Sequence, residues 1–165
     1  MIVRRFREGD EPALLDVFRS SVREVASRDY APDQIHAWAP DDVAPQAWAA
    51  RIRAIAPFVV ESEGELIAYA DVQENGYIEH FFVSGRHQHR GAGRLLMERI
   101  HQRAAAQRLA ALTADVSRTA QPFFEHFGFT LVEERMPWIR GVRLPNALMC
   151  KRLSDTATSS QPVQE

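Results

Sequence analysis

The sequence predicts a single α/β domain built on a mixed, mostly antiparallel sheet, and three observations carry this expectation. Helical and strand-like segments alternate in the order β–α–α–α–β–β–β–α–β–α–β–β. Two pairs of predicted strands are joined by the hairpin signals Glu63-Gly64 and Asn75-Gly76, which favour antiparallel neighbours. The 165 residues, 45% of them hydrophobic and 25% charged, suffice for one domain with a hydrophobic core.

The N-terminal third is expected to hold one strand and three helices. Residues 2–6 are typical of a strand, and residues 9–26 of a helix with Asp10 as its N-cap. The apolar side of that helix consists of Leu14, Val17, Phe18, Val22 and Val25. Prolines then divide the next segment into two short helices, at roughly 32–38 and 44–55.

The rest of the chain is expected to alternate strands with two helices. The expected strands are 57–62, 65–73, 77–83, 112–116, 129–135 and 146–153, and the expected helices are 92–107 and 120–127. The first three of these strands form an antiparallel meander. Residues 1–153 are expected to make the domain, and the polar residues 154–165 a disordered tail.

Composition excludes several classes of function. The net charge of -2 argues against general binding of nucleic acid, which needs a strong basic excess. No apolar run approaches the roughly 18 residues of a membrane span, and the N-terminus lacks the features of a signal peptide. Cys150 is the single cysteine, so no intramolecular disulfide forms. We expect a cytoplasmic protein without a membrane partner.

The segment VSGRHQHRGAGRLL, residues 83–96, places Gly91 and Gly93 where a helix starts. Each glycine weakens a helix by roughly 1 kcal/mol relative to alanine, which calls for a compensating role. The first amides of a helix have no intrahelical partners and, with the macrodipole, form an anion site. Glycines would let a phosphate approach, and Arg90, Arg94 and Gln88 would add charge and a donor. Alternatively, the glycines only tighten a strand-to-helix turn.

Two common phosphate loops do not fit this segment. A P-loop needs the pattern G-x-x-x-x-G-K-[ST], and no Lys-Ser or Lys-Thr pair occurs in the chain. A dinucleotide fingerprint needs three glycines in an early βαβ unit, whereas only Gly91 and Gly93 are present, after hairpin-forming strands. The sequence therefore predicts another kind of phosphate or pyrophosphate site.

The pattern V-x-x-x-x-[Q/R]-x-x-G-x-[G/A]-x-x-L, which includes Val83, Gln88 and Leu96, resembles the acyl-coenzyme-A loop of the GNAT superfamily of N-acetyltransferases. Residues 114–129, ADVSRTAQPFFEHFGF, resemble the second signature of that family. The order of elements from residue 2 to 153 fits as well. The resemblance implies a single-domain GNAT-like fold, with a twisted sheet and helices on both faces, and acetyl-CoA as co-substrate.

The resemblance also implies which residues hold acetyl-CoA. The pyrophosphate would be held by the amides of Gln88, His89, Arg90, Gly91, Ala92, Gly93 and Arg94. The backbone of Phe81, Phe82 and Val83 would pair with the pantetheine arm, and an amide near Phe81 would polarise the thioester carbonyl. Ser117 would lie near the arm, and Phe124 would pack against it.

The implied reaction is direct attack of a primary amine, from a small molecule or a peptide, on the thioester. The alternatives are a non-catalytic acyl-CoA-binding sensor or scaffold, and a nucleotide-phosphate binder unrelated to coenzyme A. An amine with a pKa of roughly 10 must first lose a proton to a base. We favour Glu79, on the face of Tyr77, with His80 as the alternative; either can instead be structural.

Three further expectations concern the surroundings of the site. Many family members carry tyrosine as a proton donor at the position of Phe124, so no general acid is assigned. Tyr30, Trp38 and Tyr77 are candidates for the acceptor wall, and the first two could equally be core. The histidine spacings fit no metal set, so we expect no metal. Strands near the C-terminus could pair in a homodimer, and the sequence does not identify the acceptor.

Overall fold

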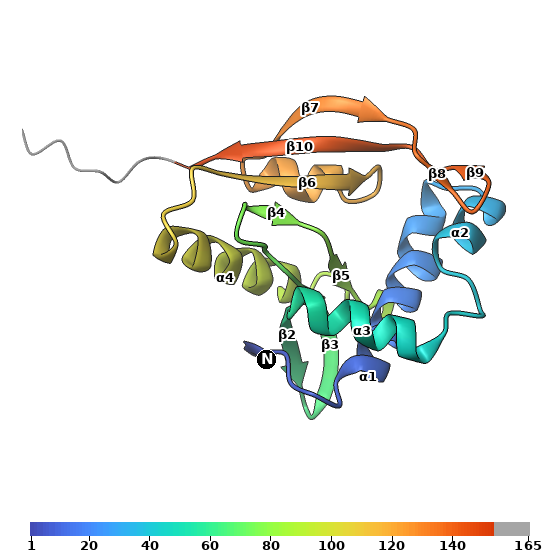
Figure 1. Ribbon diagram of the computed structural model, residues 1–165, viewed down its shortest axis with the longest axis horizontal. Coiled ribbons are helices and arrows are strands. Elements are labelled where there is room, and N and C mark those ends of the chain that lie inside the picture. The colour runs from blue at the N-terminus through green and yellow to red at the C-terminus, as the bar shows by residue number, and fades with distance from the viewer. Residues whose placement is uncertain (154–165) are drawn as a thin grey trace, which may run out of the picture.

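Eight strands of the computed structural model, which describes residues 1–153, form two four-stranded sheets (Figure 1). The first sheet has the order β1-β2-β3-β5 and is antiparallel throughout. The second has the order β4-β6-β10-β7, in which only the β4–β6 pair is parallel. The strands are β1 (Ile2–Arg5), β2 (Phe58–Ser62), β3 (Glu65–Ala70), β4 (Tyr77–Ile78), β5 (Phe81–Val83), β6 (Ala111–Ser117), β7 (Thr130–Arg135) and β10 (Asn146–Arg152). The mixed, mostly antiparallel arrangement is confirmed, and the expected tail, 154–165, lies outside the described residues.

The helices pack on the two faces of the first sheet and beside the second. They are α1 (Glu11–Ser20), α2 (Pro32–Trp38), α3 (Pro45–Ile55), α4 (Ala92–Ala106) and α5 (Gln121–His126). A π-helix, Ser21–Val25, and a 3-10 turn, Ala26–Arg28, continue α1. Within residues 1–153, no helix is both long and apolar enough to cross a bilayer.

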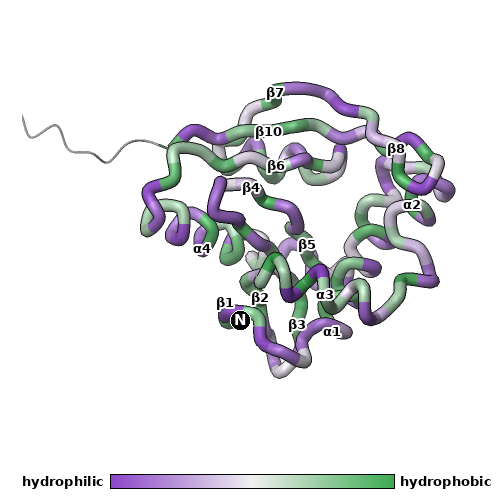
Figure 2. The backbone as a smooth tube through the Cα atoms, viewed as in Figure 1, coloured by the Kyte–Doolittle hydropathy of each residue, from purple (hydrophilic) through white to green (hydrophobic). Residues whose placement is uncertain are grey.

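The alternation of side chains along β2 and β3 builds a core on each face of the first sheet. Val59 and Tyr69 point toward α1 and α3, whereas Val60 and Ala68 point toward α4. Much of β3 is apolar, as its green colour in Figure 2 shows. The α4 side contains Leu96, Ile100 and Ala104, the residues that the four-residue spacing predicts to be stacked. All three are fully buried.

The third strand of the predicted meander is divided, and this corrects the expected continuous strand 77–83. Residues 77–78 pair in parallel with β6, and residues 81–83 pair in antiparallel with β3. The cause is Asp71, whose Oδ1 accepts hydrogen bonds from the amides of Glu79 at 2.9 Å and His80 at 2.7 Å. The amide of Asp71 still donates to the carbonyl of His80 at 3.1 Å, but the amides of Glu79 and His80 turn to the Asp71 side chain, and the chain passes from one sheet to the other.

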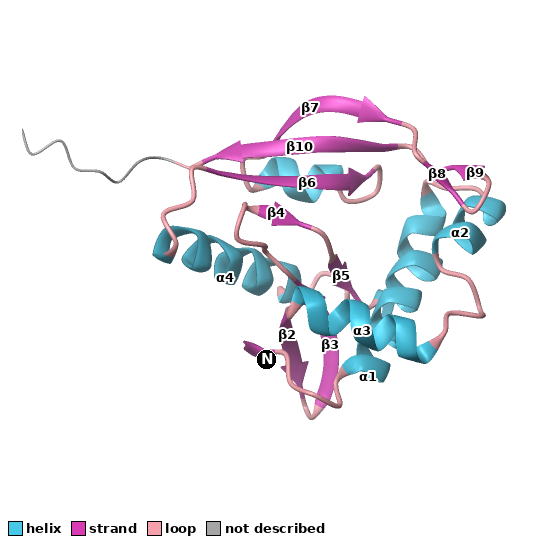
Figure 3. Cartoon of the chain, viewed as in Figure 1, coloured by secondary structure: helices cyan, strands magenta, loops and turns pink. Residues whose placement is uncertain are grey.

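Two smaller features also differ from expectation. Asp10 precedes α1, but its carboxylate accepts from the amide of Arg7 and the guanidinium of Arg4 and does not cap the helix. The loop after β7 contains a short hairpin, β8 (Trp138–Ile139) and β9 (Val142–Arg143), beside α2 (Figure 3). The proline and glycine content of that segment gave no sign of pairing.

Candidate functional site

A cleft of about 600 Å³ is lined by β5, the start of α4, the end of β6 and α5. It brings together eleven of the twelve residues proposed from the sequence to hold the co-substrate. These are Phe81, Phe82, Val83, Gln88, His89, Gly91, Ala92, Gly93, Arg94, Ser117 and Phe124. Arg90 is exposed and does not line the cleft.

The N-terminus of α4 opens into this cleft. The amide of Leu95 is paired with the carbonyl of Gly91, so the amides of Ala92, Gly93 and Arg94 precede the first intrahelical hydrogen bond. Together with the positive end of the helix dipole, these amides can bind an anion.

Glycine is required at two positions of this helix start for different structural reasons. Gly91 has a φ of +90°, in the left-handed region, and a Cβ there would meet nothing within 4 Å. Gly93 lies against Phe123, because a Cβ there would come within 3.2 Å of that ring. The turn therefore needs glycine at position 91 for its backbone angle, and the packing of α5 needs it at position 93.

The loop before α4 is braced by side chains. Gln88 donates from Nε2 to the carbonyls of Val83 and Ser84, at 2.9 and 3.2 Å, so its amide group shapes the loop from within. This differs from the expectation that the side chain faces a phosphate. The amide of Gly85 donates to Ser20 Oγ at 2.9 Å, which ties the loop to the end of α1. No local signal predicts this contact, because Ser20 lies 65 residues from Gly85 along the chain.

The middle of the cleft has an aromatic wall. The ring of Phe81 lies 5.3 Å from that of Phe123 and 5.5 Å from that of Phe124. β5 is the last strand of its sheet, so one of its edges has no strand partner within the described residues. A thin, partly apolar arm could pack against these rings and pair with the free strand edge.

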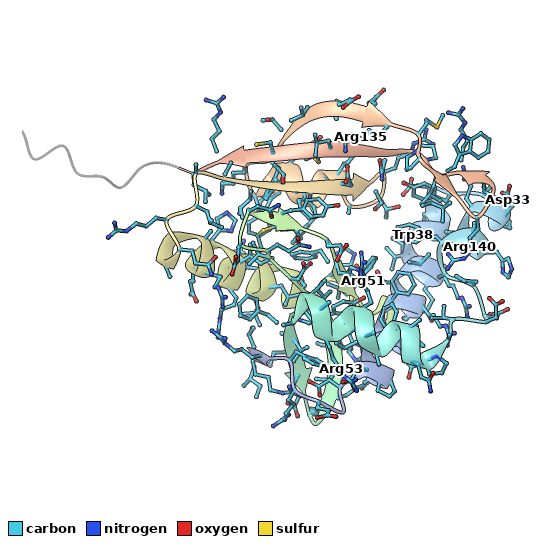
Figure 4. The ribbon with its side chains drawn as sticks, in the orientation of Figure 1. Asp33, Trp38, Arg51, Arg53, Arg135 and Arg140 are labelled. Atoms are coloured by element: carbon cyan, nitrogen blue, oxygen red, sulfur yellow. The ribbon has the colours of Figure 1, made fainter. Side chains whose placement is uncertain are left out.

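Glu79 and His80 lie at the break between β4 and β5, outside the residues that line the large cleft. The carboxylate of Glu79 forms an ion pair with Arg51, which extends from α3 toward the break (Figure 4). The side chain of Glu79 keeps 20% of its surface exposed. An anchored carboxylate thus stands one residue before His80 and two before Phe81.

His80 is held in an aromatic environment. Its Nδ1 lies 2.9 Å from the hydroxyl of Tyr69, and the rings of Phe18, Trp48 and Phe82 surround it. Burial, aided by the charge of Arg51, lowers the pKa of His80 from 6.5 to about 4. The ring is therefore neutral at physiological pH.

Asp71 is a buried carboxyl group beside these residues. Only 1% of its surface is exposed, and its Oδ2 has no partner among the described residues. Burial raises the pKa of Asp71 to about 6, although its hydrogen bond with the amide of His80 favours the ionised form. The sequence signal for this residue is its carboxylate at the end of the apolar run LIAYAD, which the spacing of the motifs does not identify.

The three residues proposed for the acceptor wall lie in different places. Trp38 lines the cleft, with its ring 6.2 Å from that of Phe82. Tyr30 is buried; its hydroxyl donates to the carbonyl of Pro145 and accepts from the amide of Arg118. Neither Tyr30 nor Tyr77 lines the cleft.

Tyr77 lies on the second sheet. Its hydroxyl donates to Asp115 at 2.9 Å, and that carboxylate also accepts from Arg135 at 3.0 Å. Burial and the neighbouring Asp115 raise the pKa of Tyr77 to about 12. The hydroxyl of Tyr77 is therefore a fixed donor within a small network.

Taken along its length, the cleft fits an acyl-coenzyme-A molecule. Unpaired amides at the start of α4 suit a pyrophosphate, and the rings of Phe81, Phe123 and Phe124 with the free edge of β5 suit a pantetheine arm. The break that carries Glu79 and His80 directly precedes that edge.

Comparison with known proteins points to the same ligand. A family model described as an acetyltransferase (GNAT) domain matches residues 26–143. The uncharacterized N-acetyltransferase YafP of Escherichia coli K12 is 29% identical over 147 residues, which cover 89% of this chain and 93% of that protein.

Solved structures share the fold. A GCN5-related N-acetyltransferase from Rhodopseudomonas palustris superposes with a TM-score of 0.88 at 24% identity, covering 92% of this chain and 95% of the other. The structure of YncA from Salmonella typhimurium, solved with its cofactor acetyl-CoA, superposes with a TM-score of 0.68 at 20% identity, covering 98% of this chain and 99% of the other. At these identities the likeness concerns the architecture.

Proposed function

Because this chain belongs to the GNAT family and is an acetyl-CoA-dependent acyltransferase, we propose that it transfers the acetyl group directly to a primary amine of a small molecule or peptide. The observation that carries the proposal is the row of unpaired amides at the start of α4, at one end of the aromatic cleft. The acceptor would approach from the side of the strand break, where Glu79 lies.

The residues of the chain have separable tasks in this proposal. Acetyl-CoA supplies a thioester as acyl donor when bound. The amides of Ala92, Gly93 and Arg94 bind its pyrophosphate, and the guanidinium of Arg94 adds positive charge at the same end. Phe124 packs against the arm, and an amide near Phe81 stabilises negative charge that develops on the carbonyl oxygen.

We assign the role of base to Glu79. A primary amine, with a pKa of roughly 10, arrives protonated and must lose a proton before it attacks. Arg51 holds the carboxylate of Glu79 beside the break with a fifth of its surface exposed, whereas His80 is packed among aromatic rings and its Nδ1 is engaged by the hydroxyl of Tyr69. The proton of the amine would therefore pass to Glu79, directly or through water.

The test is the release of free coenzyme-A thiol from acetyl-CoA in the presence of a panel of acceptors. The panel contains small primary amines, peptides with free N-termini, and matched alcohols and tertiary amines. We expect release with primary amines and none with the tertiary amines. Release of free thiol only with alcohols would refute the proposed acceptor class. So would the absence of release over the whole panel in a protein that binds acetyl-CoA tightly.

A further inference from the structure

A buried hydroxyl and an imidazole meet beside the strand break. Tyr69 lies on β3 with none of its surface exposed, and its hydroxyl is 2.9 Å from Nδ1 of His80. Within residues 1–153, no other hydrogen-bond partner reaches that hydroxyl. The direction of this single hydrogen bond determines which ring nitrogen of His80 carries the proton.

The hydroxyl of Tyr69 has one hydrogen, and His80 Nδ1 is the acceptor within its reach. If Nδ1 carried a proton and donated to the hydroxyl, the hydroxyl hydrogen would be buried without an acceptor, which proteins avoid. Burial also raises the pKa of Tyr69 well above its ordinary value, so the hydroxyl keeps its hydrogen. Tyr69 therefore donates to Nδ1, and the proton of the ring is on Nε2.

The surroundings of the ring keep it uncharged. Phe18 from α1, Trp48 from α3 and Phe82 from β5 supply aromatic faces. The charged groups near the ring are Arg51 from α3 and Asp71 at the end of β3. Burial and Arg51 both disfavour a second proton on the ring. Oδ1 of Asp71 accepts a hydrogen bond from the backbone amide of His80 and not from its ring.

The Nε2 side of the ring is the open side. His80 is partly exposed, and its Nε2 is not among the buried side-chain atoms without a partner in the described chain, which belong to Arg19, Asp71, His87 and Asn146. No described residue accepts a hydrogen bond from it. A fixed, neutral N–H donor thus stands free at the break, next to Glu79 and one residue before Phe81.

We infer that Tyr69 is a positioning residue that locks His80 as a neutral ring with its proton on Nε2, so that His80 serves the reaction as a hydrogen-bond donor and not as its base. The proposed partner of this donor is an oxygen of the reactants that meet at the break. Its N–H bond stays intact, since the proton of the attacking amine goes to Glu79. This inference rests on the proposed acetyl transfer and refines its assignment of roles.

The direct test is the nitrogen NMR spectrum of the histidine rings, recorded on the full chain between pH 5.5 and 8. The His80 signals are identified by their loss in His80→Gln or His80→Asn. We expect a protonated Nε2, an unprotonated Nδ1, and no change over this range. A proton on Nδ1, or titration near the usual histidine pKa, would overturn the inference.

Tyr69→Phe removes only the hydroxyl. We expect this variant to populate both ring tautomers of His80 and to lose about tenfold in kcat, because one positioning hydrogen bond is absent, with the KM for acetyl-CoA unchanged. Tyr77→Phe, which removes a hydroxyl bonded to Asp115, is the matched control and should leave the ring tautomer unaltered. An unchanged tautomer in Tyr69→Phe would contradict the positioning role.

The role as donor is tested by the ranking of His80 variants. His80→Gln retains an amide N–H and should keep more of the kcat than His80→Ala, which we expect to lose about 100-fold. Equal losses would contradict the donor role. If no amine supports turnover, the proposed acetyl transfer fails while the NMR result still decides the tautomer; if turnover occurs with the proton on Nδ1, this inference alone fails.

Discussion

Asp71 Oδ1 accepts a 2.7 Å hydrogen bond from the backbone amide of His80, at the point where the chain leaves one sheet for the other. The two residues carry buried ionisable groups whose pKa values move in opposite directions, to about 6 for Asp71 and about 4 for His80. Their titrations therefore oppose each other in the same range of pH.

This opposition predicts how the stability of two variants depends on pH. A carboxyl whose pKa is raised by folding binds more protons in the folded state, so Asp71 lowers the free energy of unfolding as pH rises from about 4 to 6. His80 has a lowered pKa, so it raises that free energy between pH 4 and 6.5. Each effect is about 3 kcal/mol, and in the wild type they largely cancel.

Urea unfolding between pH 4 and 7 checks the cancellation. Asp71→Asn leaves the His80 contribution alone, and its stability should rise more steeply with pH than that of the wild type. His80→Gln leaves the Asp71 contribution alone, and its stability should fall as pH rises. Parallel profiles for the two variants and the wild type would contradict the assigned burial of both groups.

Gly91→Val tests the amide cradle. Valine at this position places a side chain on a backbone with φ +90°, which is strained, and adds bulk beside the first amides of α4. We expect a loss of more than tenfold in acetyl-CoA affinity by calorimetry, and a loss of about 1–2 kcal/mol in stability from the backbone strain.

The matched control is Gly64→Val, in the β2–β3 turn. Gly64 has a φ of +79°, and a Cβ there also meets nothing within 4 Å, but the residue lies outside the cleft. This variant should lose similar stability and retain its acetyl-CoA affinity. Equal affinity losses in the two variants would show that the effect comes from strain and not from the cradle.

Local signals in the sequence were sufficient for most of the fold. The prolines and their neighbours predict helices at 32–38 and 44–55, and the structure has them at Pro32–Trp38 and Pro45–Ile55. The turn Glu63-Gly64 has positive φ at both residues, as a tight hairpin requires. Such signals lie within a few residues, so one sequence contains them.

The contacts at the strand break could not be predicted from such local signals. The division at Glu79 and His80 depends on the side chain of Asp71, and the environment of each residue depends on Arg51 and Tyr69 from other elements. The alternation of side chains along 77–83 predicts one continuous strand only if that strand pairs regularly with its neighbour. The carboxylate of Asp71 interrupts this pairing. A charged residue in an apolar strand was the available signal, and its partner could not be named without the fold.

Phe124→Tyr tests whether the chain lacks a proton donor for the departing thiolate. Phe124 is buried at 3%, within 5.5 Å of the ring of Phe81 and 5.0 Å of that of Phe129. A hydroxyl added there could reach the cleft that the ring lines. We expect kcat to change by less than about tenfold, because a coenzyme-A thiolate is a tolerable leaving group and water can protonate it. A larger gain in turnover would show that proton supply limits the reaction.

Glu79→Gln removes the proposed base while keeping the size of the side chain. We expect turnover to fall about 100-fold, because the amide cannot take the proton of the amine. His80→Gln should lose less turnover and retain the pH dependence of the wild type, since a ring that is neutral throughout contributes no titration there. Steady-state kinetics between pH 5.5 and 9 compare the two, with acetyl-CoA affinity as the control for folding. A larger loss of turnover in His80→Gln than in Glu79→Gln would move the base to His80.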